Sequence, residues 1–592
     1  MLRSTMFLKI IGVFLAGLLF SGSALAAEPE ADAPDFANHP LAGPQGTGSV
    51  VSDTYGDIMM SFGARMRVIP TSEGDWDFGF KDDLQSSGLK LLPNPDTGEA
   101  GLDSAFFKQH ANESGWVNEN YIRTEAQIYF NTMPRDRKWS FHAALEFDRP
   151  VDTVVVDDRG GYNDRTSDFG LERLHGSYKI SDTMRFHAGY DIWFVGDPAG
   201  LTYGDDAPGF WVDGSYGDWD YNAAYFKLSE NNWGTEPSAD RISDSKNDDR
   251  DLYAGYTDYN ISENRKIKGI YMFDRIRNVK AGTMLDALLR DAAKNIDDLE
   301  SLGFESDSSI KNLSLPEKEP DTDSHYLGLV YEAETGMANY FLEGIYQFGQ
   351  ADDTGLDTLY PQGRDDYDIN AFAFAGDLEL DLDDSVGYGF KPHIGFIYAS
   401  GDDDPEDDEL GGYTGVVSHQ RFTKFGGENT IMADGNTMLG SVVYSYLPGL
   451  YGNGTPVVTG GLPNTTGLGT ARGDNPGLTM TSAGITLEPR RFLSFKSNVN
   501  SFWWNEDIEV QSLVDPTLAP TQVDSGYVGT EWDNELTLAL SRHTIVKAQG
   551  ALFFPGEVVE DVTSARSATP SGPGEESDDM AYRLGMEFIW MF

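Results

Sequence analysis

Apolar and polar residues alternate over segments of about ten positions along almost the whole chain, and this pattern constrains the fold more than any other feature. One face of the last segment is apolar and aromatic, and carries Tyr582, Leu584, Met586, Phe588, Trp590 and Phe592. The opposite face of that segment carries Arg583, Gly585 and Glu587. The first segment, at residues 58–68, is divided in the same way. The pattern predicts strands with one lipid-facing and one polar face, and end segments that pair to close a ring.

The N-terminus has the features of a secretory signal peptide. Arg3 and Lys9 precede or flank an apolar run at 10–20, and Ala24-Leu25-Ala26 forms a small-residue cleavage site. After it, no stretch approaches the roughly 18 to 20 uninterrupted apolar residues that a spanning helix needs. We therefore expect residues 1–26 to be a cleaved signal peptide, 27–55 an N-terminal periplasmic tail, and 56–592 an outer-membrane barrel.

The alternating segments number about 18, which is even, as it must be when both termini face the periplasm. Short polar connections such as 134–137 and 181–183 alternate with long ones such as 276–322 and 401–475. The segment 439–446 is apolar enough to be another strand, but counting it makes the number odd, so we assign it to the 401–475 loop. The predicted fold is all-β: a transmembrane antiparallel β-barrel of about 18 strands, with long extracellular loops and one short loop helix.

That helix is predicted at 283–302, where Leu285, Leu288, Leu289, Ala292, Ile296 and Leu299 recur at helical spacing. It is short and amphipathic rather than spanning. It could be a lid or plug that narrows the pore, or a helix packed on the outer rim, and the second interpretation is favoured.

Composition agrees with a barrel whose charges lie in loops and lumen. The chain has 96 Asp and Glu against 43 Lys and Arg, a formal charge of -53, so we expect no nucleic-acid partner. Aromatic residues make up 12% and there are 65 glycines, too many rings for a disordered acidic polymer. Cysteine is absent, which excludes disulfides and thiolate chemistry.

Several C-terminal motifs carry a family likeness. They are Gly529-Thr530-Glu531-Trp532-Asp533 followed by Leu536-Thr537-Leu538, then Gly550-Ala551-Leu552-Phe553-Phe554-Pro555-Gly556, then Asp579-Met580-Ala581-Tyr582 leading to Phe592. A weaker likeness lies at Ala399-Ser400-Gly401-Asp402-Asp403-Asp404-Pro405. This part of the chain resembles the C-terminal end of the alginate-export family. The resemblance implies an outer-membrane barrel of about this strand number and, as one functional possibility, a polysaccharide secretion pore.

Residues on the inward parity are predicted to line the lumen and set its selectivity. They are Arg65, Arg67, Arg123, Glu125, Arg173, Arg185, Lys391, Lys496, Glu531, Asp533, Glu535 and Arg583. The early strands form a cationic sector and the 531–535 segment an acidic one. Such a wall either imposes a transverse field on solutes or forms internal salt bridges, and both interpretations stay open. Glu172 falls on the outward parity, which indicates a bulge or a register change.

Two groups of residues are candidate ion sites. His142, His175 and His187 lie at similar depth on neighbouring strands, which would suit a metal or proton-linked gate, although plain polar lumen residues are favoured. The acidic runs at 402–409 and 352–357 could bind calcium, although a solvated, repulsive surface is favoured. We predict no metal site and no cofactor.

The predicted function is passive passage of polar or charged small solutes or oligosaccharides. Alternatives are an alginate-export-type secretion pore and a non-conducting structural or surface barrel. An enzyme is not expected, because His419 and the lumen histidines have no Ser partner at a defined spacing. The expected partners are outer-membrane lipid, lipopolysaccharide, the barrel-assembly machinery and polar solutes.

Overall fold

The structure is a computed structural model of the whole chain. It describes residues 50–55, 58–74, 92–93, 100–101, 119–150, 170–230, 249–277, 321–352, 365–404, 407–416, 425, 475–510, 518–519, 521–566, 568–574, 576 and 578–591. The predicted signal peptide lies outside these residues.

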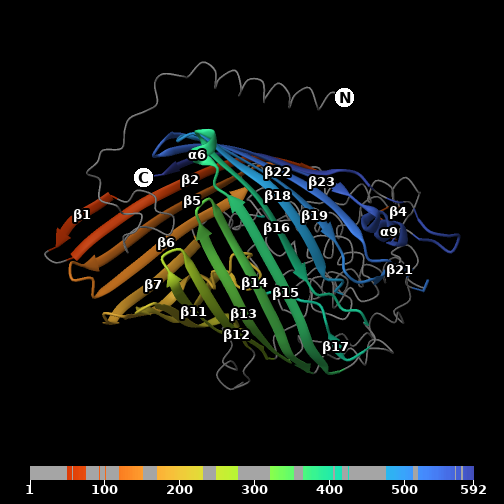
Figure 1. Cartoon of the computed structure of the whole chain (residues 1–592), viewed down its shortest axis with the longest axis horizontal. Coiled ribbons are helices and arrows are strands. Elements are labelled where there is room, and N and C mark those ends of the chain that lie inside the picture. Colours follow the sequence, from red (N-terminus) through yellow and green to blue (C-terminus); the bar gives the residue numbers. More distant parts are fainter. Residues whose placement is uncertain are drawn as a thin grey trace, which may run out of the picture.

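One large sheet, antiparallel in all its barrel pairings, dominates the molecule and closes on itself (Figure 1). It contains 20 strands, of which β1 (Val50–Tyr55) and β17 (Glu409–Leu410) are short additions, leaving the predicted 18 in the barrel. The first nine barrel strands are β2 (Ile58–Gly74), β5 (Glu119–Pro134), β6 (Trp139–Pro150), β7 (Gly170–Ser181), β8 (Met184–Phe194), β9 (Gly204–Tyr216), β10 (Trp219–Glu230), β11 (Asp249–Ser262) and β12 (Arg265–Ile276). The other nine are β13 (Asp321–Thr335), β14 (Ala338–Asp352), β15 (Tyr367–Leu380), β16 (Gly389–Ala399), β18 (Leu478–Arg490), β19 (Leu493–Trp503), β22 (Tyr527–Ser541), β23 (Thr544–Pro555) and β24 (Ala581–Met591).

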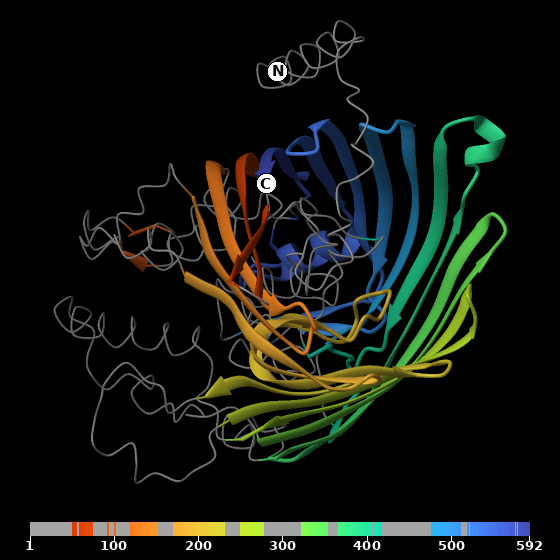
Figure 2. The same cartoon turned by 90° about the vertical axis from the view of Figure 1, so that its left-hand side faces the viewer.

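The barrel closes where β2 meets β24, as the sequence predicts. β2 pairs with β5 on one side, and on the other with β24, from Arg65 opposite Met591 to Gly74 opposite Tyr582. Figure 2 shows the sheet curving round to this join. Every barrel strand therefore has a hydrogen-bonded neighbour on both sides, which is the condition for crossing a lipid bilayer with strands.

β1 lies in the segment expected to be a periplasmic tail. It pairs with β2 from Val50 opposite Phe62 to Tyr55 opposite Ile58. β24 has already ended at this level, since its Met591 pairs with Arg65. β1 therefore covers the part of the β2 edge that β24 does not reach, and an exposed strand edge is a site for unwanted pairing.

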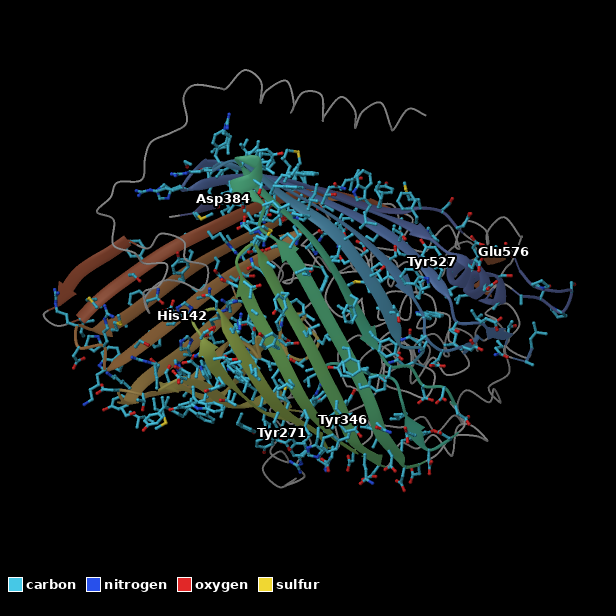
Figure 3. The ribbon with its side chains drawn as sticks, in the orientation of Figure 1. His142, Tyr271, Tyr346, Asp384, Tyr527 and Glu576 are labelled. Atoms are coloured by element: carbon cyan, nitrogen blue, oxygen red, sulfur yellow. The ribbon has the colours of Figure 1, made fainter. Side chains whose placement is uncertain are left out.

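The two rims differ in the length of their connections, as predicted. One rim, here called the turn rim, carries the connections at 135–138, 182–183, 217–218, 263–264, 336–337, 381–388, 491–492 and 542–543. The opposite rim, the loop rim, carries all the long connections. Asp384 at the turn rim and Glu576 at the loop rim mark the two ends of the barrel in Figure 3.

Large apolar side chains cover the outer face. Leu329 and Ile394 are 62% and 61% exposed on it. Near the loop rim five outward rings form one register row across β10 to β14: Tyr225, Tyr253, Phe273, His325 and Phe348. Neighbouring rings in this row lie 4.5 to 5.8 Å apart. Such a band is typical of the interface between lipid and water.

A bulge explains the anomaly at Glu172. The β6–β7 register shifts so that Ala144 opposes Arg173 and Leu145 opposes Leu171. Glu172 is the extra residue, and it lets Arg173 point inward while Leu171 stays 54% exposed on the outer face. The predicted irregularity is therefore present.

The helices differ from the predicted one. The 283–302 helix and the 439–446 segment both lie outside the described residues, and the strand count is complete without the latter. Two helices that the sequence did not predict are α6 (Asp383–Val386) at the turn rim and α9 (Glu557–Arg566) at the loop rim. Val558, Val559 and Val562 form the buried face of α9. No helix among the described residues is long and apolar enough to cross a membrane.

Candidate functional site

A chain of alternating charges crosses the inner wall at the join of the barrel. Arg65 and Arg67 on β2 both bind Glu125 on β5, and Arg67 also binds Glu587 on β24. Lys547 on β23 lies 3.7 Å from Glu587. It also lies 3.8 Å from Glu535 on β22, which completes the chain. We call this set, Arg65, Glu125, Arg67, Glu587, Lys547 and Glu535, the seam ladder.

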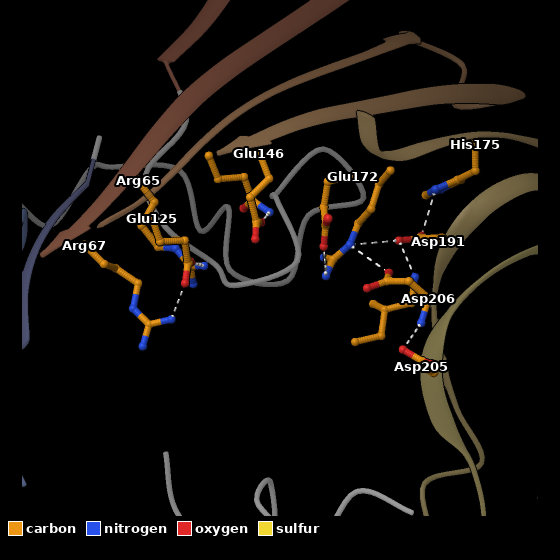
Figure 4. A network of polar contacts seen from close by, with 12 residues as sticks. Arg65, Arg67, Glu125, Glu146, Glu172, His175, Asp191, Asp205 and Asp206 are labelled. Atoms are coloured by element: carbon orange, nitrogen blue, oxygen red, sulfur yellow. Dashed lines mark hydrogen bonds and ion pairs between the residues drawn. The ribbon is translucent and has the colours of Figure 1, made fainter. Parts of the chain in front are cut away.

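A second charged group continues along the wall on β7, β8 and β9. Arg173 lies 3.3 Å from Asp206, 3.6 Å from Asp191 and 3.8 Å from Glu172. His175 lies 2.8 Å from Asp191. Figure 4 shows this group facing the same space as Arg65, Arg67 and Glu125, with Glu146 between them. The early strands are thus not a purely cationic sector, because each described arginine of the ladder and of this group has acidic neighbours.

The other predicted lumen residues also lie on the inward parity of their strands. Arg185 donates to Ser177 and to the carbonyl of Arg137. Lys391 lies 3.9 Å from Glu488. Lys496 pairs in register with Glu535, and Arg583 with Ala551. The side chain of Arg123 on β5 lies outside what the structure describes.

The predicted acidic cluster on β22 is divided. Glu531 is fully buried and Asp533 accepts a hydrogen bond from Asn500 at 3.1 Å. Glu535 accepts instead from Gln549 at 2.7 Å and joins the seam ladder through Lys547. Glu535 thus connects the cluster to the seam ladder.

The three lumen histidines do lie side by side. Ring centroids of His142 and His175 are 5.3 Å apart, and those of His175 and His187 are 6.0 Å apart. Trp211 stacks on His187 at 4.9 Å. Each imidazole has a polar partner, Asn131 for His142, Asp191 for His175 and Asp213 for His187. Within the described part of the chain, no group of three or more His, Asp or Glu side chains is placed to hold a metal ion.

Sequence reasoning missed a loop that folds into the barrel. Residues 195–203, between β8 and β9, contain the fully buried Val195, Leu201 and Tyr203. An inward side chain three strands along the wall binds the loop backbone: Lys268 on β12 donates to the carbonyls of Val195 and Gly196 at 3.0 and 2.9 Å. We call this segment the inner loop.

A second segment, residues 410–416, packs on the inner loop. Tyr413 donates its hydroxyl proton to the carbonyl of Leu201 at 3.0 Å. Tyr326 on β13 donates to the carbonyl of Thr414 at 3.1 Å, and Arg250 on β11 to that of Val416 at 3.2 Å. Arg250 is itself held by Asp274 at 2.7 Å. The two segments belong to one buried apolar core, to which barrel strands from β8 round to β24 and the helix α9 also contribute.

The sequence pattern identifies some of the side chains that hold these two segments. Arg250 and Lys268 lie on the inward parity of segments that the sequence predicts as strands, and the same rule finds them. The inward position of the inner loop could not be predicted, because the periodicity of neighbouring strands does not show where the loop between them folds. Its buried apolar residues are the one sequence signal, since an exposed loop would not need them.

Acidic side chains gather around α9 at the loop rim. Burial, followed by the nearby Asp578 and Glu576, raises the pKa of Glu560. Burial and Glu576 likewise raise the pKa of Asp561. These carboxylates repel one another. The acidic runs at 402–409 and 352–357 lie partly outside the described residues.

Comparisons with known proteins identify no family for the chain. No protein-family model matches it, and no curated protein matches it. Among solved structures it is similar to an outer-membrane expressed OmpT of Vibrio cholerae, with 9% identity and TM-score 0.36 over 91% of this chain and 99% of that chain. It is similar to OccK8 (OprE) of Pseudomonas aeruginosa, with 10% identity and TM-score 0.44 over 90% and 98%. The structure of Pseudomonas aeruginosa OpdK with vanillate gives 10% identity and TM-score 0.40 over 90% and 99%.

Proposed function

We propose that the protein is a passive outer-membrane channel for polar or charged small solutes or oligosaccharides. The observation that carries this proposal is a charged inner wall inside a closed barrel with an apolar outer face. A wall that presents cations and anions side by side attracts polar and charged solutes and disfavours apolar ones.

The proposed setting follows from the same features. An apolar, aromatic-banded outer face needs lipid around it, and a signal peptide at 1–26 would deliver the chain to the periplasm for insertion by the barrel-assembly machinery. The long, acidic loop rim would then face outward, among lipopolysaccharide. Proteolysis of intact cells would test this orientation, because only loop-rim sites should be cut.

Planar-bilayer recording of the refolded protein tests the channel. We expect discrete conductance steps in salt solution, and solute permeation in liposome swelling for small sugars or amino acids. The matched control is the same preparation left unfolded. Silent bilayers and non-swelling liposomes from a folded, heat-modifiable barrel would reject the proposal and favour the non-conducting structural or surface barrel.

A polysaccharide secretion pore is the second candidate, supported by the C-terminal motifs that resemble the alginate-export family. An anionic polymer needs cations along its path. Arg65, Arg67 and Arg173 are close to acidic partners, which favours small solutes over such a polymer. Block of the conductance by anionic but not neutral oligosaccharides added to one side would favour the secretion pore.

A further inference from the structure

The outer face of the barrel carries a group of polar side chains on β18, β19 and β22. The strands on either side present large apolar residues: Ile394 and Phe396 on β16 are 61% and 42% exposed, and Phe554 on β23 is 44% exposed. Between these strands, the register places a set of hydroxyl and amide side chains on the outward parity. They are Thr481, Ser497, Ser501, Thr530 and Asn534, and we call this set the polar window.

Contacts among these side chains place them on the outer surface. Trp532 is 44% exposed there and donates its indole N–H to the hydroxyl of Ser497 at 3.1 Å. The hydroxyl oxygens of Ser501 and Thr530 lie 2.7 Å apart. Asn534 lies two residues beyond Trp532 on the same strand and is partly exposed. Because side chains two apart on a strand share a face, the Asn534 amide also points outward.

In the proposed membrane setting, the polar window lies at the depth of the hydrocarbon. Toward the loop rim it is followed by a row of outward aromatic rings, Tyr398, Trp503 and Tyr527, and the rings of the last two are 5.7 Å apart. Figure 3 labels Tyr527 on the loop-rim side of the barrel. Toward the turn rim the next outward pair is apolar, Phe495 opposite Leu536. Outward aromatic rings mark the level of the lipid headgroups, so headgroups and water lie beyond the window.

Asn534 is the member of the window for which a lipid environment is most costly. Its amide offers N–H donors and an oxygen acceptor, and no residue in the described part of the chain forms a hydrogen bond with it. Its register neighbours are Gly550, which has no side chain, and Ser497, which already accepts from Trp532. Lipid acyl chains have no hydrogen-bonding groups, so an amide facing them keeps its full desolvation cost. The window therefore favours a protein partner over lipid.

We propose that the polar window is the contact surface between two copies of the chain, which form a symmetrical dimer in the membrane. Amide and hydroxyl groups both donate and accept, so the window is complementary to itself. Across a twofold axis each copy offers the other the same groups, which satisfies both Asn534 amides without a second kind of chain. Val499 and Trp532, 42% and 44% exposed between the polar residues, supply apolar contact area. The pairing rests on the proposed membrane setting and not on conduction.

Disulfide cross-linking of the refolded full chain in liposomes tests the pairing. The chain has no cysteine, so an introduced thiol has no competitor. We expect Val499→Cys, in the middle of the window, to form a disulfide-linked dimer on oxidation. Leu329→Cys is the matched control, because Leu329 is 62% exposed on the outer face of β13, outside the window, and it should stay monomeric. Equal linking of both variants, or no linking of an inserted, heat-modifiable Val499→Cys barrel, would overturn the dimer. A barrel that does not insert into liposomes would overturn the membrane setting, and the pairing with it.

Sedimentation equilibrium in detergent tests the role of Asn534. We expect the association constant of Asn534→Leu to fall by about threefold or more, the effect of losing a hydrogen bond between membrane segments. Thr124→Val is the control, since Thr124 is an outward hydroxyl on β5, away from the window, and its loss should leave association unchanged. A wild type that is monomeric at every concentration would overturn the dimer, as would equal association of Asn534→Leu and the wild type. Cross-linking of Val499→Cys to a different protein in native membranes, with a monomeric purified barrel, would assign the window to that protein instead of a second copy.

Discussion

Arg67 on β2 binds Glu587 on β24, so a salt bridge spans the join between the first and last barrel strands. The same guanidinium donates to Glu125 on β5 at 2.7 Å. Backbone hydrogen bonds join every pair of neighbouring barrel strands. The Arg67 side chain in addition links β24, β2 and β5, at the place where the first and last barrel strands pair. The seam ladder thus has a structural role besides its position on the wall.

Replacing Arg67 by Met should weaken the barrel. Glu587 is 1% exposed, and removing its arginine leaves a buried charge that still has Lys547 at 3.7 Å. We expect a loss of about 3 kcal/mol, at the low end for breaking a buried pair because that lysine remains. Denaturant unfolding in detergent, followed by the gel mobility of the folded barrel, measures it.

Two variants check the interpretation of that loss. Lys179→Met removes a lysine whose partner, Asp182, is 96% exposed at the turn rim, and should change stability by well under about 1 kcal/mol. Arg67→Met combined with Glu587→Gln removes the stranded charge and should recover part of the loss. Equal stability of the single and double variants would show that burial of Glu587 is not the cause.

Arg173→Gln should shift ion selectivity. The change leaves Asp191, Asp206 and Glu172 without their common cation on the lumen wall. Reversal potentials in a salt gradient should move toward cation preference, because fixed negative charge attracts cations into the pore. The control is Lys138→Gln, a cation at the exposed turn rim beside Tyr178, which should leave the reversal potential nearly unchanged. An unchanged potential in Arg173→Gln would place the conducting path away from β7.

The strand framework could be predicted because each strand has one face toward lipid and one toward the lumen. That requirement makes apolar and polar residues alternate with a period of two in each barrel strand. It fixed the count of 18, the pairing of the end strands and even the irregularity at Glu172. It also placed the seam-ladder arginines and Glu125 on one face, although it did not say which charges would pair.

The inner loop could not be predicted in the same way. Its contacts to Lys268, Glu343 and Tyr413 join positions far apart in the chain, and no local pattern encodes them. Buried polar groups must find partners, but many inward side chains could have supplied them. The sequence did not predict α9, because three valines at helical spacing in an acidic loop are too short a pattern to indicate a helix.

Gly209→Ala should disturb the wall beside Trp211. A Cβ at Gly209 would lie 2.1 Å from the carbonyl oxygen of Tyr225 and 2.5 Å from the Phe226 ring, so β9 and β10 would have to separate. We expect a cost of about 1–3 kcal/mol in unfolding experiments, as for other overpacked sites. Gly269→Ala is the control, since its nearest neighbour would be Thr257 Cγ2 at an ordinary 3.9 Å. Similar losses in both variants would show that the close approach at Gly209 is not the cause.

Tyr413→Phe should loosen the inner loop while leaving the barrel intact. The change removes the hydroxyl that donates to the carbonyl of Leu201, the described hydrogen bond between the two inward segments. A hydrogen bond of this kind contributes about 1 kcal/mol, so the amides of Leu201 and Thr202 should exchange with solvent about fivefold faster. Hydrogen exchange followed by mass spectrometry measures this, with peptides of β13 and β14 as internal references. Tyr388→Phe, an exposed tyrosine beside α6 at the turn rim, is the matched variant and should leave exchange in residues 195–203 unchanged. Unchanged protection in Tyr413→Phe would mean that Lys268 and Glu343 alone hold the loop.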